Sequence, residues 1–206
     1  MDEDEEIVSP TERRGLNPFL IPISKSKKSP GKDVGVLCYI RWPTQKEDMD
    51  LQLVRTTEAG LSLVAMETKT YIMRKAVEMD YVMHPDTQKV VDLLNEGEET
   101  PLYSIGDYLP FFKSGKFPTL TEDDRRVALD KYLLIKVGQF PDCYDRIANN
   151  FMEAKNDVSA LVTCERSLSI FYGWGFTSAF LSQILLQCGG RDKEARDSAK
   201  GSLAII

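Results

Sequence analysis

The first regular pattern of apolar positions lies at residues 34–66 and has the two-residue period of β-strands. Apolar and aromatic side chains alternate between Val36 and Trp42, and further apolar runs follow at 51–55 and 61–66. Pro43 ends the first run, because proline has no N–H to donate to a strand ladder. The pattern therefore predicts a small three-stranded antiparallel meander.

After these strands the apolar spacing becomes that of helices. An amphipathic helix is predicted from Glu67 to Met83, where Pro85 stops it, and it is expected to cover the apolar face of the meander. Another helix is predicted from Thr121 to Gly138. Four more helices are predicted at about 142–155, 157–171, 176–188 and 191–204. The fold class is therefore α+β, with the meander and one helix followed by an all-helical half.

The last four predicted helices carry a weak internal repeat. Five identities recur at an offset of 35 residues: Asp157/Asp192, Ala160/Ala195, Ser167/Ser202, Leu168/Leu203 and Ile170/Ile205. The tetratricopeptide unit is a helical hairpin of about 34 residues that keeps a small residue where its helices cross. Ala160 and Ala195 fit that position. The repeat predicts two tetratricopeptide-like hairpins at about 141–172 and 176–206, with two ordinary hairpins of similar length as the alternative.

Composition divides the chain into three predicted domains. Residues 1–32 are rich in charge, serine and proline and are expected to be a flexible tail. The apolar stretch at 17–23 interrupts this tail and is expected to dock as an extended arm, with a partner-binding linear motif as the alternative. A small α+β subdomain is expected at 33–100 and a helical subdomain at 101–206.

No pattern of residues indicates a catalytic, metal or cofactor site. His84 is the single histidine, the four cysteines form no C-x-x-C pair, and there is no phosphate-binding glycine loop. A net charge of −6 argues against general nucleic-acid binding. We therefore expect a non-enzymatic protein with protein partners, no cofactor, no metal and no small-molecule substrate. The alternatives are an enzyme with a site between the meander and the helices, or a generic helical adaptor.

Partner-binding residues are expected on the first helix of each hairpin, because that helix lines the concave face of a tetratricopeptide-like stack. The outward positions are Asp142, Asp145, Asn149 and Met152 in the first hairpin and Thr177, Phe180 and Ile184 in the second. Trp42 and Trp174 join this set because exposed tryptophans supply much of the energy of interfaces; a core position is the alternative for both. The acidic end of the face favours a basic or mixed peptide segment.

Several short motifs, taken in order, resemble a plant and algal plastid family of photosystem I assembly factors. They are Asn17–Pro22, Arg41–Thr44, Tyr132–Asp142, Val158–Thr163 and Glu194–Gly201. Some members are labelled calcium homeostasis regulators, which no residue chemistry in this chain supports. The resemblance implies a stromal chloroplast protein, peripherally associated with the thylakoid, that promotes photosystem I accumulation by binding its subunits or a membrane-anchored assembly factor. It implies no catalytic residues.

Overall fold

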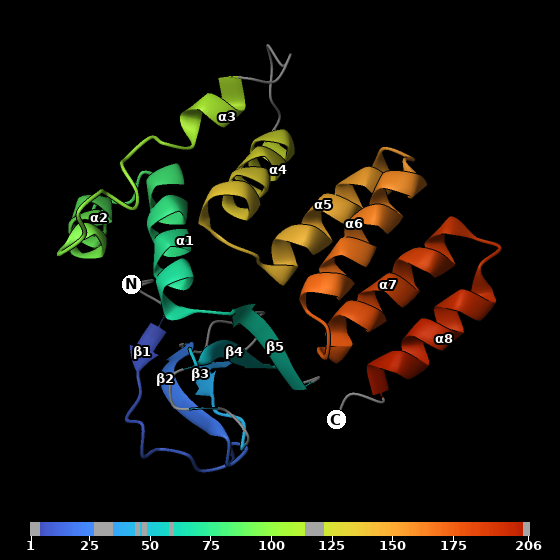
Figure 1. Ribbon diagram of the computed structural model, residues 1–206, viewed down its shortest axis with the longest axis horizontal. Coiled ribbons are helices and arrows are strands. Elements are labelled where there is room, and N and C mark those ends of the chain that lie inside the picture. The colour runs from blue at the N-terminus through green and yellow to red at the C-terminus, as the bar shows by residue number, and fades with distance from the viewer. Residues whose placement is uncertain are drawn as a thin grey trace. The chain divides into compact units, whose positions relative to one another are not determined.

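The computed structural model describes residues 5–26, 35–43, 46, 49–57, 60–113 and 122–203 (Figure 1). The strands are β1 (Glu5–Ile7), β2 (Leu20–Ser26), β3 (Val36–Ile40), β4 (Gln52–Thr57) and β5 (Gly60–Ala65). The helices are α1 (Thr68–Tyr81), α2 (Thr87–Asn95), α3 (Leu109–Lys113), α4 (Glu122–Tyr132), the π-helix η1 (Leu133–Val137), α5 (Pro141–Glu153), α6 (Asp157–Ile170), α7 (Gly175–Cys188) and α8 (Asp192–Leu203). The predicted α+β class is confirmed. The chain forms two compact units, Met1–Tyr71 and Ile72–Ile206.

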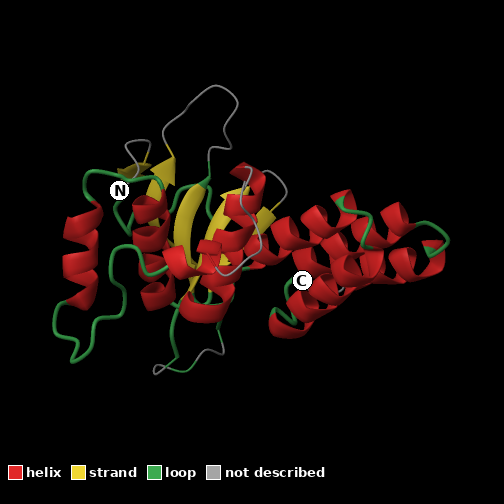
Figure 2. Cartoon of the chain, turned by 90° about the horizontal axis from the view of Figure 1, so that it is seen from above, coloured by secondary structure: helices red, strands yellow, loops and turns green. Residues whose placement is uncertain are grey.

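The first unit is built on one antiparallel sheet with the strand order β1-β2-β3-β4-β5, whose strands are yellow in Figure 2. The predicted meander corresponds to β3, β4 and β5, and the described residues add two strands that the pattern did not predict. Residues 20–23 of the apolar stretch expected as a docked arm lie in β2, where Leu20 pairs with Ile40 and is 1% exposed. The proline in this stretch, Pro22, hides the strand signal, and the pairing of β2 with β3 shifts its register between Pro22 and Ser24.

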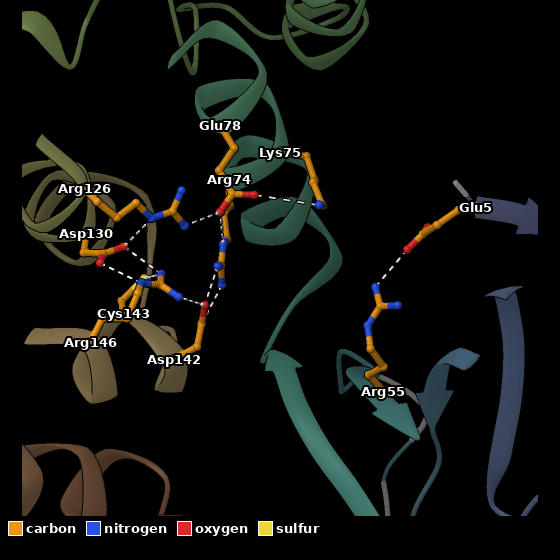
Figure 3. Close-up of polar contacts among 10 residues, drawn as sticks. All are labelled: Glu5, Arg55, Arg74, Lys75, Glu78, Arg126, Asp130, Asp142, Cys143 and Arg146. Atoms are coloured by element: carbon orange, nitrogen blue, oxygen red, sulfur yellow. Dashed lines mark hydrogen bonds and ion pairs between the residues drawn. The ribbon is translucent and has the colours of Figure 1, made fainter. Parts of the chain in front are cut away.

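A cross-strand ion pair ties the first strand to the rest of this sheet. Nη2 of Arg55 on β4 donates to Oε1 of Glu5 at 2.8 Å (Figure 3), and Nη1 of Arg55 donates to the Ser26 hydroxyl at 3.0 Å. Ser24 donates to the other Glu5 oxygen at 2.9 Å. Residues 5–26 of the predicted tail therefore contain two paired strands, while 27–34 lie outside the described residues. The three-domain division stays a prediction.

The four helices at the end of the second unit lie side by side in chain order as antiparallel neighbours (Figure 1). Pro141 occupies the first turn of α5, where a missing N–H costs nothing. The side chain of Asn156 caps α6 by accepting from the Ser159 N–H at 3.2 Å. Gly189 ends α7 with a φ of 70°, a conformation that favours glycine. The four helix positions predicted from periodicity agree with α5–α8 to within a few residues.

The core of these hairpins is a cluster of small and medium side chains. Ala148, Ala160, Cys164 and Ile184, from α5, α6 and α7, are at most 1% exposed, and Phe151 is among the side chains that pack against them. Small residues at these positions let the helix backbones approach one another. The buried alanine at position 160 agrees with the crossing role given to it by the repeat, but the tetratricopeptide-like interpretation itself stays a prediction.

The helix predicted from Thr121 to Gly138 is in fact α4 continued by one π-helical segment, with Thr121 outside the described residues. The Gly138 N–H donates to the Leu133 carbonyl at 2.9 Å, which closes the π-turn. The side-chain amide of Gln139 donates to the Leu134 carbonyl at 3.0 Å and satisfies an acceptor that the helix end leaves free. The side-chain amide oxygen of Gln139 in turn accepts from the Tyr144 hydroxyl on α5. The Gln139 side chain therefore links the end of η1 to α5.

The two helices of the last hairpin approach closely through small residues. A Cβ placed on Gly175 of α7 would lie 2.4 Å from the backbone oxygen of Ser202 on α8. The Ser198 hydroxyl donates to the Ser178 carbonyl at 2.8 Å, a second close contact between the two helices. By contrast, a Cβ on Gly201 would meet nothing nearer than the Ser178 hydroxyl at 3.9 Å. The two glycines therefore tolerate a methyl group to very different degrees.

We predict that Gly175→Ala lowers the free energy of unfolding by about 1–3 kcal/mol, because the α7–α8 backbones must separate. The matched variant Gly201→Ala should raise it by up to about 1 kcal/mol, since alanine replaces glycine within a helix and has room. Urea unfolding followed by circular dichroism measures both. Equal effects of the two substitutions would contradict the close α7–α8 packing.

Candidate functional site

Charged side chains from α1, α4 and α5 form a closed ring of alternating sign (Figure 3). In order around the ring they are Arg74, Glu78, Arg126, Asp130, Arg146 and Asp142, and Asp142 contacts Arg74 again. We call this set the charge ring. Each helix supplies one arginine and one acid four residues apart, a spacing that places both side chains on the same helical face.

The shortest contacts in the charge ring hold α5 from two sides. Nη1 and Nη2 of Arg74 donate to the two carboxylate oxygens of Asp142 at 2.7 and 2.6 Å. Nε and Nη2 of Arg146 donate to the two oxygens of Asp130 at 2.8 and 2.7 Å. Nη1 of Arg146 also donates to Asp142 at 2.8 Å. Paired, charge-assisted bonds of this kind fix geometry as well as distance, so they set the orientation of α5 against α1 and α4.

The direct link between α1 and α4 is looser. Glu78 accepts from Nε of Arg74 at 3.0 Å and lies 3.3 Å from Nη2 of Arg126. Nε of Arg126 lies 3.7 Å from Asp130 and closes the circuit. Lys75 approaches the second Glu78 oxygen at 3.7 Å from outside the charge ring. Most of the directional bonding in the charge ring therefore passes through α5.

The centre of the charge ring is shielded from water. Asp130 is fully buried, Arg74 is 8% exposed, and the Arg74 guanidinium lies 4.8 Å from the centroid of the buried Phe140 ring. Burial raises the pKa of Asp142, but the hydrogen bonds from Arg74 and the charges of Arg74 and Arg146 outweigh it and hold that pKa well below its usual range. Asp142 is therefore ionised at neutral pH.

The charge ring is balanced within itself, because its three arginines face three carboxylates. We therefore assign it a structural role that locks α1, α4 and α5 together. Sequence reasoning did not find it. The signal was present as three opposite-charge pairs spaced four residues apart on predicted helices. Their meeting depends on tertiary packing, which the spacing does not give.

The four cysteines are free and are poorly suited to nucleophilic or redox chemistry. Burial raises the pKa of Cys38 to about 11 and, with the charge of Asp145, that of Cys164 to about 12. Burial also raises the pKa of Cys143, beside the charge ring, and that of Cys188. The thiolate is the reactive form of cysteine, so a raised pKa leaves these side chains as apolar packing groups.

Among residues 5–26, 35–43, 46, 49–57, 60–113 and 122–203, no group of three or more His, Cys, Asp or Glu side chains could hold a metal ion. None of the described helices combines the length and the apolar character that crossing a bilayer requires.

The four residues of the first hairpin that were predicted to face a partner have different environments in the structure. Asp142 belongs to the charge ring, and its carboxylate is already bonded to two arginines. Asp145 is half-buried, Asn149 is exposed, and Met152 packs against the core cluster of the hairpins. Of the two acids at the end of the predicted face, Asp142 is therefore neutralised from within the protein.

The second hairpin corrects part of the predicted face. Thr177 and Ile184 are 2% and 0% exposed, and Phe180 packs against the core cluster. The reason is that α7 contacts α6, α8 and α5 and carries no charged residue, so little of it faces water. Trp174 is half-buried with its ring 6.2 Å from that of Phe176. Whether any of the predicted residues binds a partner stays a prediction.

Trp42 is the predicted contact residue in the first unit. Its side chain is 43% exposed, and its indole N–H donates to Oε1 of Gln52 at 3.3 Å. This hydrogen bond orients the indole at the end of β3 while leaving part of the ring accessible. The geometry is compatible with the predicted contact role, which stays a prediction.

We predict that Asp142→Lys destabilises the protein, because it leaves Arg74 and Arg146 without their shared acid and adds a like charge between them. Since Asp142 is 43% exposed, water screens part of this effect, and we expect a loss of about 1–3 kcal/mol. Asn149→Lys, on an exposed position of the same helix, is the matched control and should change stability by less than about 0.5 kcal/mol. Thermal unfolding of both variants tests the structural role of the charge ring.

Comparison with known proteins gives two matching family models. The first, described as PAB N-terminal, matches residues 2–120, and the second, described as PAB middle domain, matches residues 141–205. The second range contains both terminal helical hairpins, while the first contains the sheet and helices α1–α3. No solved structure matches the chain.

A curated relative of the chain is the "Protein IN CHLOROPLAST ATPASE BIOGENESIS, chloroplastic" of Arabidopsis thaliana. It is 33% identical over 201 residues, which is 97% of this chain and 54% of the relative. The chain thus spans about half the length of the curated relative that it matches. The resemblance of the sequence motifs to chloroplast assembly factors is consistent with this relative, which is named as a chloroplast biogenesis protein. The relative is named for ATPase biogenesis, however, and not for photosystem I. With one family model covering more than half of its length, the chain belongs to the PAB family.

Proposed function

We propose that this protein is a non-enzymatic assembly factor of the chloroplast that binds an intermediate of the chloroplast ATPase. The observation that carries this proposal is the 33% identity over nearly the whole chain with a protein named for chloroplast ATPase biogenesis. The described residues support a binding role. The ring acids are neutralised by arginines, and the buried thiols have raised pKa values.

Photosystem I remains the competing client. The ordered motifs favour it, whereas the name of the relative favours the ATPase, and the two predict different co-purifying proteins. Both clients are consistent with a stromal protein that associates with the thylakoid only peripherally, and we include this location in the proposal. We give the ATPase precedence because its support extends over 201 aligned residues and not over short motifs.

The exposed apolar residues of α6 are the surface that we assign to the client. Val158 and Val162 are 74% and 59% exposed and lie four residues apart, on one face of α6. Exposed valines next to each other on a helix are suited to a protein contact, because burying them against a partner removes apolar area from water. The face predicted from sequence is less suitable, since Thr177 and Ile184 are buried.

Affinity purification of the tagged, full-length protein from chloroplast extract tests this proposal. We expect ATPase subunits to co-purify with the wild type and their recovery to fall several-fold with the double variant Val158→Glu/Val162→Glu. The matched control Leu93→Glu changes an apolar residue on α2 that is 70% exposed and should not reduce recovery. Thermal unfolding should be nearly unchanged in both variants, because all three side chains are more than half exposed.

Each other outcome of the purification contradicts a defined part of the proposal. Recovery of photosystem I subunits in place of ATPase subunits would overturn the ATPase assignment and favour the competing client. Recovery of no specific protein would overturn the assembly-factor role. Equal losses with the α6 and α2 variants would show that the α6 valines are not the contact surface.

A further inference from the structure

Two buried polar atoms in the described residues lack a hydrogen bond, and both belong to the α5–α6 hairpin. They are Oδ1 of Asp145 on α5 and Oγ of Ser167 on α6. Most buried polar side-chain atoms in folded proteins have a hydrogen-bond partner, so each exception calls for a physical reason. Both atoms lie in one hairpin, so the packing of this hairpin leaves two polar side-chain atoms without hydrogen bonds.

The surroundings of Asp145 offer no cation that is free to pair with it. On its own helix, the charges that act on it are Asp142 and Arg146, and Arg146 is already bonded to Asp130 on α4 and to Asp142. Asp142 is itself held by Arg74 of α1. The charge ring therefore uses the nearby arginines and leaves an additional negative charge next to Asp145.

Among the described residues, no cation from the two other helices that pack around α5 in the hairpin core acts on Asp145. From α6, the titratable group close enough to interact with Asp145 is the Cys164 thiol, which is 1% exposed. Glu165 and Arg166, the charged residues of α6 near this level, are both exposed. Arg166 interacts with the Tyr144 hydroxyl on α5, one residue before Asp145, and is not among the charges that shift the pKa of Asp145. Helix α7 carries no Asp, Glu, Lys, Arg or His, and its titratable group is Cys188 at the C-terminal end.

An ionised Asp145 therefore costs more free energy in the closed hairpin than a protonated one. Burial, followed by the charge of Asp142, raises the pKa of Asp145 to about 7, while Arg146 opposes the shift. Asp142, three residues earlier on the same helix, has its pKa moved in the opposite direction. The two carboxyl groups differ because one is bonded to arginines and the other is not.

We propose that Asp145 is a proton-operated switch for the packing of the α5–α6 hairpin against α7. With a proton on Asp145 the hairpin is closed around Ala148, Cys164 and Ile184. Loss of the proton favours an open state in which the carboxylate is hydrated and this apolar cluster becomes accessible. The inference goes beyond the proposed function and does not depend on the identity of the client.

The direction of the pH dependence follows from linkage. A hydrated aspartate in the open state has a pKa of about 4, and Asp145 in the closed state has a pKa of about 7. Between these values the closed state binds a proton that the open state does not bind. The equilibrium constant for opening therefore rises by up to about tenfold per pH unit over this range and is constant above it. Closure is strongest at acidic pH and weakest at neutral pH and above.

Hydrogen–deuterium exchange of the backbone amides in α5, α6 and α7, corrected for the intrinsic exchange rate at each pH, measures this opening. In the wild type we expect the opening constant to increase on the order of a hundredfold from pH 5 to pH 7 and to level off above pH 8. Asp145→Asn, which mimics the protonated side chain, should remain protected and independent of pH. Glu153→Gln removes an exposed acid from the same helix and should follow the wild type.

Carbon-13 NMR titration of the Asp145 carboxyl group in the wild-type protein provides a second test that needs no variant. A titration midpoint near 7 supports the switch, and a midpoint near 4 overturns it. A pH-independent opening constant in the wild type, or the same pH dependence in Asp145→Asn, would also overturn it.

Discussion

The charge ring is the interaction on which the rest of the helical unit depends. It joins α1 to α4 and α5, which follow much later in the sequence, through bonds that require each guanidinium to meet its carboxylate in a defined orientation. Desolvating buried ions is costly, and only good geometry and full hydrogen bonding offset the cost. A misaligned α5 would leave buried Asp130 with only the 3.7 Å contact to Arg126, and Arg74 with only Glu78. The charge ring therefore selects one register for α5, and α6–α8 continue from that helix.

The same constraint determines what the protein can offer a partner. Because the charge ring is self-balanced, Asp142 is not available to attract a basic peptide, although its sequence position suggests an acidic face. Apolar residues with high exposure lie instead on α6, at Val158 and Val162. Exposed apolar residues, together with thiols whose pKa values are raised, suit the proposed role of a protein that holds a client without chemistry. This is the role that we propose for the chain in the PAB family.

Asp142 and Asp145 show how one helix can place the same side chain in opposite electrostatic states. Asp142 accepts from two arginines, which lowers its pKa below the usual range, whereas burial and the neighbouring charge raise the pKa of Asp145 to about 7. The strong bonds that stabilise α5 in the charge ring also use Arg146, the cation whose charge acts on Asp145. The pH sensitivity that we infer is thus a consequence of the interaction that fixes the fold.

The sequence by itself determined the elements whose signals are local. The alternation at 36–42, the stops at Pro43 and Pro85 and the periodicity after 140 predicted β3, α1 and α5–α8, because side-chain period and proline chemistry act within one element. Strand β2 escaped this reasoning because Pro22 masks its pattern. Only the tertiary structure decided that Thr177 and Ile184 of α7 are buried. It also decided that the arginine and acid pairs on α1, α4 and α5 meet in one ring. Burial and ion pairing depend on the helices on every side of a residue, and spacing along one helix does not specify its neighbours.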